Sequence, residues 1–338
     1  MDEDLKKKTE KNLLIKKEYK SDELISKYPP KLFSQKKKLL TKFSLKPEIP
    51  HQSKVTFSKY KSFTLPKTLK PKTKLIMKED SFDYKSLEVE NSVEWHINFA
   101  DFNLFGFYGG SLFAQDEIQV AEHPILASIK EELTSTMNGD IIKGPYTATK
   151  TGIATPCLVK GAERRINVEL EPNESKNRPI GLYGNNFRMA TDDAIKSAIT
   201  VYDPPTISNI IGIEAPKPSS GEYTRSQISN ILVTAYSGFL SAKYETILEN
   251  EDSKTIIHTG NWGTGAYGGH KELMAILQIL AAQLASIDIL VYHTFQNQYS
   301  DAYEKGEKFL STLEETDVNK IIQILEDRHY RWGQSDGN

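Results

Sequence analysis

Apolar and polar positions follow two different periods beyond about residue 85. Strand-like runs of alternating or continuous apolar residues are SVEWHINFADF, TPCLVKG, RINVELE, SNIIGIEA, TIIHT and DILVYHTF. Runs with a helical period lie among them: QDEIQVAEHPILASIKEEL, MATDDAIKSAITVY, TRSQISNILVTAYSGFLSAKYETI and KELMAILQILAAQLASI. Because strands that alternate with helices pack in layers, the pattern predicts an α/β domain whose central sheet is covered by helices on both faces.

Residues 1–84 have a different texture, with few sustained apolar periods and only short helices expected near Leu5–Lys20 and Leu32–Phe43. The first 78 residues hold 22 lysines and eight acidic residues, whereas the other 260 hold 21 basic and 37 acidic residues. This asymmetry predicts a lysine-rich arm, partly disordered or helical, that lies on the acidic domain. Attachment to an anionic membrane or to nucleic acid is the alternative, but no aromatic-interleaved motif accompanies the lysines, so neither has a firm signal.

The predicted domain covers residues 85–300, and residues 301–338 read as a helical extension through GEKFLSTLEE and VNKIIQILEDRHYRW. No run reaches the roughly 18 apolar residues of a membrane helix, and the charged N-terminus lacks a signal-peptide core. The single cysteine, Cys157, excludes an intrachain disulfide, and TPCLVKG favours a buried strand residue over a nucleophile. His258, His270 and His293 are not spaced as a ligand set, so we expect no metal and no cofactor.

Five of the chain's 20 glycines lie in TGNWGTGAYGG, residues 259–269, directly before a helical run. Glycine permits positive φ and a close approach of the backbone to a ligand, and a helix start offers free N–H groups and partial positive charge. A tight strand–helix connection needs only one or two glycines, so the density favours a phosphate or nucleotide site. The stretch matches neither the GxGxxG nor the P-loop pattern, so it does not name the ligand.

A second stretch, NFADFNLFGFYGGSLFAQDEIQ, covers residues 98–119. It places a strand-end acid, three glycines and a polar triplet in sequence: Asp101, Gly106, Gly109, Gly110, Gln115, Asp116 and Glu117. A carboxylate beside a glycine-lined site suits proton transfer to a leaving group. Adjacent carboxylates raise each other's proton affinity, although a helix start opposes this. Without the other glycine-rich stretch, an ordinary acidic helix start would be the better interpretation.

Together the two stretches resemble the poly(ADP-ribose) glycohydrolase family, a branch of the macrodomain fold. TGNWGTGAYGGHKELMAILQILAAQLASIDILVYHTF is similar to that family's TGNWGCGAFGGD segment, its following helix and its YFTF strand. SNIIGIEAPK with ISNILVTAYSGF resembles the preceding strand and helix, and NFADF, YGG and QDE resemble the signature VDFANRFVGGG…QEE. The matching order spans about residues 88–297 and implies a macrodomain-like mixed central sheet flanked by helices.

The resemblance implies that ADP-ribose lies across the end of the sheet. Tyr267 would cover the phosphates or a ribose, Asn261 would fix the loop or the distal ribose, and Phe295 would pack against a ribose face. Glu90 loosely matches the family's adenine-reading acid. The diphosphate would be held by the backbone of Gly263, Thr264, Gly265, Ala266 and Gly268.

Glu117 matches the family's catalytic glutamate, which would protonate the leaving atom and then activate water. Asp116 would orient the ribose hydroxyls or share the proton transfer. Gln115 and Asp101 would position the distal ribose. The glycines of the signature that would border this end of the ligand are Gly109 and Gly110.

The departures from the family pattern cluster near the expected scissile bond. Tyr108 replaces the first of three glycines, four residues instead of six to eight lead to the acids, and Leu104 lies about where an asparagine is expected. These changes favour removal of single ADP-ribose units from protein side chains, with release of ADP-ribose. An arginine linkage is favoured because Asp116 and Glu117 would hold a guanidinium.

Three alternatives stay open at this point. One is poly(ADP-ribose) glycohydrolase activity, another is a non-catalytic ADP-ribose reader, and the weakest is a nucleotide-binding interaction module tethered by its basic arm. The composition is compatible with a bacterial cytoplasmic protein. The acidic STLEETD near the C-terminus is also compatible with an effector translocated into a host cell, where it would reverse the modification made by a partner ADP-ribosyltransferase. The sequence does not indicate an oligomeric state.

Overall fold

The computed structural model describes residues 3–70, 72–137, 139–295 and 300–335. Its centre is an eight-stranded sheet with the order β1-β2-β5-β6-β4-β7-β8-β3. The strands are β1 (Leu13–Lys20), β2 (Lys54–Tyr60), β3 (Lys74–Lys78), β4 (Ser92–Ala100), β5 (Cys157–Val168), β6 (Ile199–Glu214), β7 (Lys254–Gly260) and β8 (Ile289–His293).

Helices surround this sheet in the order of the chain. They are α1 (Glu3–Asn12), α2 (Ser21–Lys27), α3 (Gln35–Ser44), α4 (Gln115–Glu122), α5 (Ile125–Thr136), the 3-10 helix η1 (Glu174–Lys176), α6 (Asn186–Met189), α7 (Asp192–Ser197), α8 (Arg225–Ile247), α9 (Lys271–Leu284), α10 (Ser300–Ser311) and α11 (Val318–Glu326). The arrangement is a mixed α/β macrodomain fold, as the sequence predicts.

The sheet has a parallel and an antiparallel half. β4 pairs in parallel with both β6 and β7, and β8 pairs in parallel with β7 and β3. β1, β2, β5 and β6 pair in antiparallel fashion. The carboxyl ends of the parallel strands therefore meet at one edge, which is where ligands bind in open α/β sheets.

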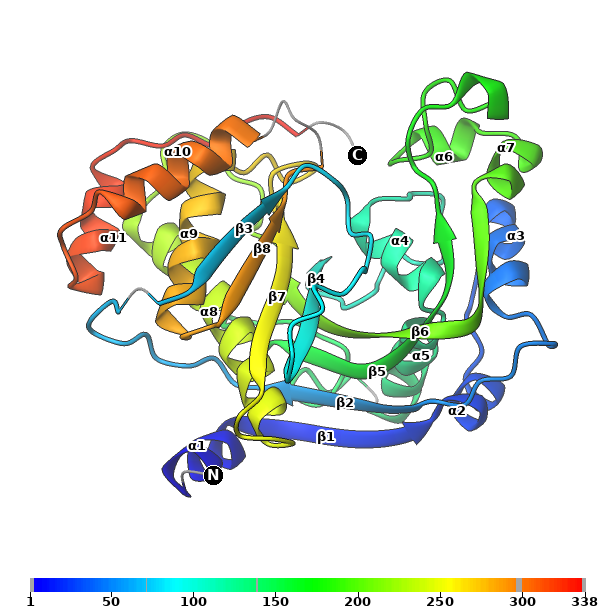
Figure 1. Cartoon of the computed structure of the whole chain (residues 1–338), viewed down its shortest axis with the longest axis horizontal. Coiled ribbons are helices and arrows are strands. Elements are labelled where there is room, and N and C mark those ends of the chain that lie inside the picture. Colours follow the sequence, from blue (N-terminus) through cyan, green and yellow to red (C-terminus); the bar gives the residue numbers. More distant parts are fainter. Residues whose placement is uncertain (1–2, 71, 138, 296–299, 336–338) are drawn as a thin grey trace.

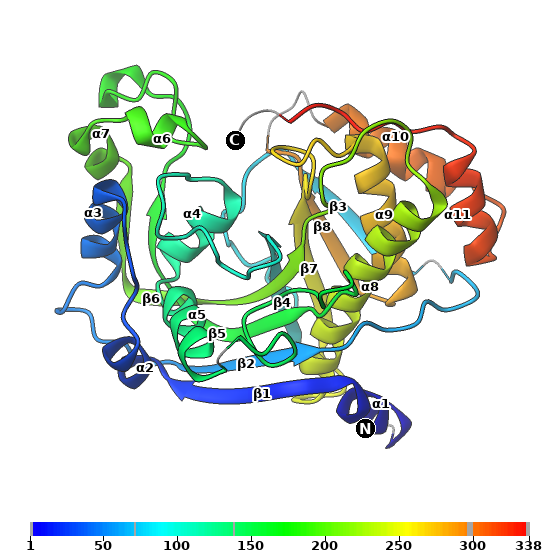
Figure 2. The ribbon, with the colours of Figure 1, turned by 180° about the vertical axis from the view of Figure 1, so that it is seen from behind.

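Two apolar cores lie on opposite faces of the sheet. Neighbouring residues of β5 alternate between them, since Leu158 joins one core and Cys157 and Val159 join the other. The first core holds the apolar faces of α8 and α9, with α10 and α11 outside them, and the second holds α5 and part of α2. Figures 1 and 2 show these helical groups at the two ends of the curved sheet.

The N-terminal segment differs from the expected arm over residues 1–84. Within its described residues, β1, β2 and β3 belong to the central sheet. The helix expected over Leu32–Phe43 agrees with α3, but the helix expected over Leu5–Lys20 ends at Asn12, where β1 takes over. β1 is an edge strand whose lysines alternate between exposed and half-buried positions, and charge on an edge strand hinders further pairing.

Two of the predicted helices also have different limits. The helix expected over residues 115–133 is divided into α4 and α5 at Pro124, which precedes α5 as its N-cap. The helix expected over residues 189–202 gives way to β6 at Ile199, because the β-branched run pairs with β5 through Val168 and Ile166.

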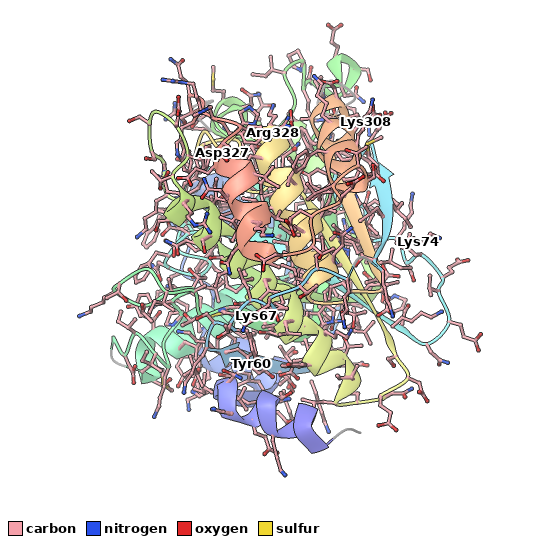
Figure 3. The ribbon with its side chains drawn as sticks, turned by 90° about the vertical axis from the view of Figure 1, so that its left-hand side faces the viewer. Tyr60, Lys67, Lys74, Lys308, Asp327 and Arg328 are labelled. Carbon is pink, nitrogen blue, oxygen red and sulfur yellow. The ribbon has the colours of Figure 1, made fainter. Side chains whose placement is uncertain are left out.

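The C-terminal residues return to the glycine-rich loop. From the side, Figure 3 shows α10 and α11 outside α9, with Asp327 and Arg328 at the end of α11. After α11 the Trp332 ring stacks on Tyr223 at 4.2 Å, and Gly333 N–H donates to Gly268 O at 2.8 Å. The tail outside the family resemblance therefore packs against the segment that the resemblance identifies.

Cys157 is buried in β5, as expected, and burial raises the pKa of its thiol to about 11. Such a thiol carries little thiolate at neutral pH and is a core residue. In the described part of the chain, no helix has both the length and the apolar character needed to cross a membrane.

Candidate active site

A cavity of about 770 Å³ opens at the carboxyl ends of the parallel strands. Its walls come from the end of β4 with the start of α4, the loop after β7, the turn after β8, the segment after β3 and the lobe between β5 and β6. Gly333 and Gln334 of the C-terminal tail complete the lining. Both glycine-rich stretches of the sequence thus meet at one cavity.

The loop between β7 and α9 presents its backbone to the cavity. Gly269 N–H donates to Gly263 O and Gly268 N–H to Gly265 O, both at 2.9 Å, which curls the loop into a compact turn. Over the residues that the structure describes, the N–H groups of Gly265, Ala266 and Tyr267 have no hydrogen-bond acceptor. Successive free N–H groups of this kind form an anion-binding nest, which suits a phosphate.

Glycine is required at two positions of this loop. Gly263 and Gly268 have φ of 73° and 66°, and a Cβ at Gly263 would lie 2.6 Å from Pro216 Cδ. Asn261 anchors the loop from the side, because its Nδ2 donates to Thr294 O at 2.9 Å. Of the two roles expected for Asn261, this geometry matches fixing the loop.

Tyr267 connects the loop to β4. Its hydroxyl donates to Asp101 Oδ2 at 3.0 Å, and Asp101 Oδ1 accepts from Asn103 N–H at 3.1 Å. Burial, followed by the Asp101 charge, raises the pKa of Tyr267, so its hydroxyl stays protonated. The bond ties the nest to the residues that lead into α4.

Asp116 and Glu117 lie in the first turn of α4, and both line the cavity while being largely buried. Glu117 Oε2 accepts from Ala114 N–H at 2.9 Å, and Asp116 Oδ1 accepts from Asn98 Nδ2 at 2.9 Å. Burial and, next, the Glu117 charge raise the pKa of Asp116 well above its ordinary value. The pair therefore retains a proton near neutral pH, as a proton-transfer site requires.

Gln115 lines the same wall, but its side chain is hydrogen-bonded to β4 of the sheet. Its Oε1 accepts from Phe99 N–H at 2.8 Å, and its Nε2 donates to Ile97 O at 2.9 Å. Both ends of the amide thus bond to β4 and fix the start of α4 against that strand. The role predicted for Gln115 on the distal ribose is not visible in this arrangement.

The lobe between β5 and β6 forms the wall opposite the loop. Phe295, which has φ of 69°, lies with its ring 5.3 Å from that of Tyr183, and both rings line the cavity. Ile180 from the lobe and Phe107 from the glycine-rich turn line the cavity and are both largely exposed. Aromatic and apolar surface is therefore available for a ribose or base.

Three predicted residues do not line the cavity. Glu90 is exposed in the turn before β4, at the end of the strand opposite to the cavity, because β4 runs from Ser92 towards it. Gly109 packs against the N-terminal segment, where a Cβ would lie 2.4 Å from Lys31 O. Gly110 N–H bonds to Phe107 O within the same turn. The sequence had placed all three on the ligand.

Tyr108 also lies away from the cavity. Its hydroxyl accepts from Lys31 N–H at 2.7 Å and donates to Glu131 Oε1 at 2.8 Å. The residue that replaces the family's first glycine is therefore a buried link between the N-terminal segment and α5. It does not narrow the ligand site.

The sequence prediction missed the segment Asp80–Tyr84, whose Asp80, Phe82 and Tyr84 line the cavity. Asp80 Oδ1 lies 2.7 Å from His293 Nδ1, and although partial burial would raise the pKa of Asp80, this hydrogen bond lowers it. The signal was the run EDSFDY directly after the strand-like KLIMK, which places acids and aromatics at a strand end as NFADF does.

Two of the buried histidines, His258 and His293, lie within hydrogen-bond distance of each other. His293 Nε2 lies 3.0 Å from His258 Nδ1, and His258 Nε2 lies 2.9 Å from Glu94 Oε2. Within the described residues, no three His, Cys, Asp or Glu side chains are grouped so as to hold a metal ion. A larger, open groove of about 1250 Å³ along β1, β2, β5 and β6 contains none of the predicted site residues.

Residues 179–302 match the family model described as poly(ADP-ribose) glycohydrolase with a macro domain fold. Over this segment the chain is similar to the PARG-like macrodomain family. The matched segment contains the loop of the anion-binding nest, Phe295 and the lobe. It does not contain Asp101, Asp116 or Glu117, so their assignment depends on the motif and on the geometry.

A curated relative from Arabidopsis thaliana, a probable poly(ADP-ribose) glycohydrolase 2, is 22% identical over 231 residues. The alignment covers 59% of this chain and 39% of the relative, so the chain matches well under half of that protein's length. The poly(ADP-ribose) glycohydrolase of Deinococcus radiodurans, solved with ADP-ribose, is similar to 87% of this chain over 95% of its own, with 12% identity and a TM-score of 0.46. The enzyme from Thermomonospora curvata is similar over 90% and 89%, with 10% identity and a TM-score of 0.38.

Proposed function

We propose that the chain hydrolyses the glycosidic bond that joins the ribose of ADP-ribose to a leaving group. The observation that carries this proposal is that a buried carboxyl pair, Asp116 and Glu117, and a phosphate nest of three free N–H groups line one cavity. The nest suits the diphosphate and the carboxyl pair suits proton transfer at the ribose. The similarity of residues 179–302 to the poly(ADP-ribose) glycohydrolase family supports the same substrate class.

In the proposed mechanism the diphosphate lies on the N–H groups of Gly265 to Tyr267. The bond from the anomeric carbon to the leaving atom breaks with both electrons going to that atom, which takes a proton from the carboxyl pair. Glu117 is assigned this transfer, and Asp116 shares the proton with it. Water then adds to the oxocarbenium-like ribose and returns one proton to the carboxylate, so that the products are ADP-ribose and the protonated leaving group.

Poly(ADP-ribose) is the substrate that the comparisons favour. The sequence favoured single ADP-ribose units partly because Tyr108 replaces a glycine near the expected scissile bond, but Tyr108 bonds to Lys31 and Glu131 instead of lining the cavity. The other part, an acidic pair that holds a guanidinium, is weakened because Asn98 and the Ala114 N–H already occupy one oxygen of each carboxyl group. We therefore place poly(ADP-ribose) first and arginine-linked mono-ADP-ribose second.

Product analysis tests the proposal. The purified chain is incubated with poly(ADP-ribose), with an arginine-linked and with an acidic-residue-linked mono-ADP-ribosyl protein, and free ADP-ribose is quantified. Release from poly(ADP-ribose) supports the proposal as stated, and release only from a mono-ADP-ribosyl protein replaces the substrate. Tight ADP-ribose binding without any release would identify a reader and end the enzymatic proposal. Action within a host cell against a partner ADP-ribosyltransferase stays a prediction.

A further inference from the structure

A lysine occupies a core position of α3. The residues of this helix that are buried are Lys37, Leu40 and Ser44, which have the i, i+3, i+7 spacing of an inward-facing stripe. Lys37 is 2% exposed. It belongs to the N-terminal segment, outside both the stretch of family resemblance and the segment matched by the family model. Such a position is usually occupied by an apolar residue, so a buried lysine here requires a group that compensates its charge.

The immediate surroundings of Lys37 offer the ammonium little direct compensation. Its Nζ lies 4.8 Å from the centroid of the Phe113 ring and 5.9 Å from that of Phe187, and the two rings are stacked at 4.3 Å. Its hydrogen bond, to Tyr108 O, is 3.3 Å long. Burying an ammonium carries a desolvation penalty that a cation–π contact offsets only in part. Opposite charge nearby is needed to offset the remainder.

That opposite charge is the carboxyl pair. The Phe113 ring that Lys37 contacts directly precedes Ala114, the N-cap of α4, and the Ala114 N–H donates to Glu117 Oε2 at 2.9 Å. Burial lowers the pKa of Lys37 to about 8, and the charges of Glu117 and then Asp116 oppose this decrease. Lys37 in return opposes the increase in the pKa of Asp116.

Other groups face the pair from neighbouring elements. Asp101 at the end of β4 raises the pKa of Asp116, and Asn98 of β4 lowers it through its hydrogen bond. Lys130 of α5, bonded to Asn103 Oδ1, also interacts with the Asp116 charge, as does Tyr267 from the loop. The charges of both Lys37 and Lys130 thus interact with the pair, and Lys37 opposes the increase in the pKa of Asp116.

We propose that Lys37 is a positioning residue of this site, whose caged ammonium keeps one carboxylate of the Asp116–Glu117 pair ionised while the other holds the proton. The catalytic part of this inference rests on the proposed function. Without the ammonium, burial and the neighbouring Glu117 charge would raise the proton affinity of Asp116 further. The pair would then offer less negative charge to stabilise the oxocarbenium-like ribose as the leaving group departs.

The neighbouring lysine links α3 to the lobe that forms one wall of the cavity. Lys36 Nζ donates to Arg188 O at 2.5 Å and also to Ala190 O, which lie at the carboxyl end of α6 in the lobe. One helix of the N-terminal segment therefore contacts both the lobe and α4, the helix that carries the carboxyl pair. A loss of activity in a Lys37 variant could therefore come from disturbed packing of α3. The test has to separate the effect of the Lys37 charge from that of packing.

The test compares Lys37→Met with the matched control Lys59→Met. Lys59 is likewise fully buried, but it donates to Ile141 O and Gly144 O away from the cavity. The first readout is the pH profile of kcat for ADP-ribose release. We expect Lys37→Met to move its acid limb to higher pH by about one to three units, the effect of losing one nearby opposite charge, with KM nearly unchanged. Lys59→Met should leave the limb in place.

The second readout is the titration of the Asp side chains by ¹³C carboxyl NMR, which does not require turnover. The Asp116 resonance, assigned with Asp116→Asn, should titrate at higher pH in Lys37→Met. If that variant does not fold, Lys37→Gln keeps a donor for Tyr108 O without the charge and should show the same shift. Unshifted profiles in the folded variants, or an equal shift in Lys59→Met, would overturn the inference. If the Asp116 titration differs between the wild type and Lys37→Met but the wild type releases no ADP-ribose, the effect of Lys37 on the pair stands and only the proposed function is overturned.

Discussion

Tyr267 and Asp101, 166 positions apart in the sequence, share a hydrogen bond of 3.0 Å between the tyrosine hydroxyl and Oδ2 of the carboxylate. This bond joins the glycine-rich loop after β7 to the strand that leads into the carboxyl pair. Since hydrogen bonds to charged groups contribute about 1.5 to 3 kcal/mol, its loss should loosen the loop that we propose to bind the diphosphate.

We therefore expect Tyr267→Phe to weaken ADP-ribose binding about tenfold, which corresponds to roughly 1.4 kcal/mol. Asp101→Asn combined with Tyr267→Phe should cost less than the sum of the single changes, with an interaction energy of about 0.5 kcal/mol or more. Calorimetric titration of the four proteins with ADP-ribose measures this. Strict additivity of the two changes would show that the bond does not matter for binding.

Glu90→Gln should leave ADP-ribose binding within about twofold of the wild type, because a surface change away from the ligand has little effect. The structure places Glu90 in the turn before β4, away from the cavity. The same calorimetric titration decides the matter. A tenfold loss of affinity would restore the adenine-contacting role that the sequence suggested and would contradict the placement of the cavity.

Gln115→Glu should destabilise the fold and leave binding nearly unchanged. One oxygen of the new carboxylate can still accept from Phe99 N–H. The other oxygen replaces the Nε2 donor and faces Ile97 O, so that two acceptors lie side by side without a proton between them. An unmatched buried acceptor costs about 1 to 3 kcal/mol. Urea unfolding measures this loss. Unchanged stability with lost ADP-ribose affinity would instead indicate that Gln115 contacts the ligand.

Asp116→Asn should stabilise the protein at alkaline pH while lowering its activity. Because the pKa of Asp116 is raised by burial and by Glu117, the folded state binds this proton more tightly than the unfolded chain. The aspartate then destabilises the fold increasingly as the pH rises above about 4, and each unit of raised pKa corresponds to about 1.4 kcal/mol. Asparagine avoids this cost and still accepts from Asn98 Nδ2.

The free energy of unfolding from urea titrations at pH 8 should thus exceed that of the wild type by at least about 1 kcal/mol, and the gain should shrink as the pH falls towards 4. The opposite pH trend, with a gain that grows towards acid pH, would mean that the Asp116 carboxylate is stabilised in the folded protein.

The glycine-rich loop after β7 and its flanking elements were predictable because their signals are local. The glycines of TGNWGTGAYGG, the apolar period of α9 and the apolar run of β8 follow one another without interruption. The glycine content, the helical period and the apolar run all indicate the same order of loop, helix and strand, and such agreement makes local structure predictable from sequence. The carboxyl pair could be found for the same reason, since Asp116 and Glu117 are neighbours in the chain.

The N-terminal strands could not be read in this way. In β1 the lysines lie on an edge strand, Lys16 and Lys20 exposed and Lys17 half-buried against Glu132. Net charge alone does not distinguish such a strand from a solvated tail. The roles of Lys37, Tyr108 and Asp80 depend on partners at least 70 positions away, which include Tyr108 O, Lys31 N and His293 Nδ1. Long-range pairs of this kind leave no periodic signal in one sequence.

The central claim is that Glu117 transfers the proton in a glycosidic hydrolysis, and Glu117→Gln tests it most directly. The variant and the wild type are compared for release of free ADP-ribose from poly(ADP-ribose) and for calorimetric ADP-ribose affinity. We predict that release falls about 10² to 10⁴-fold, the usual contribution of general acid–base catalysis, while affinity changes little. Full turnover in the variant would contradict the account, because the carboxyl group at position 117 would then not carry the proton.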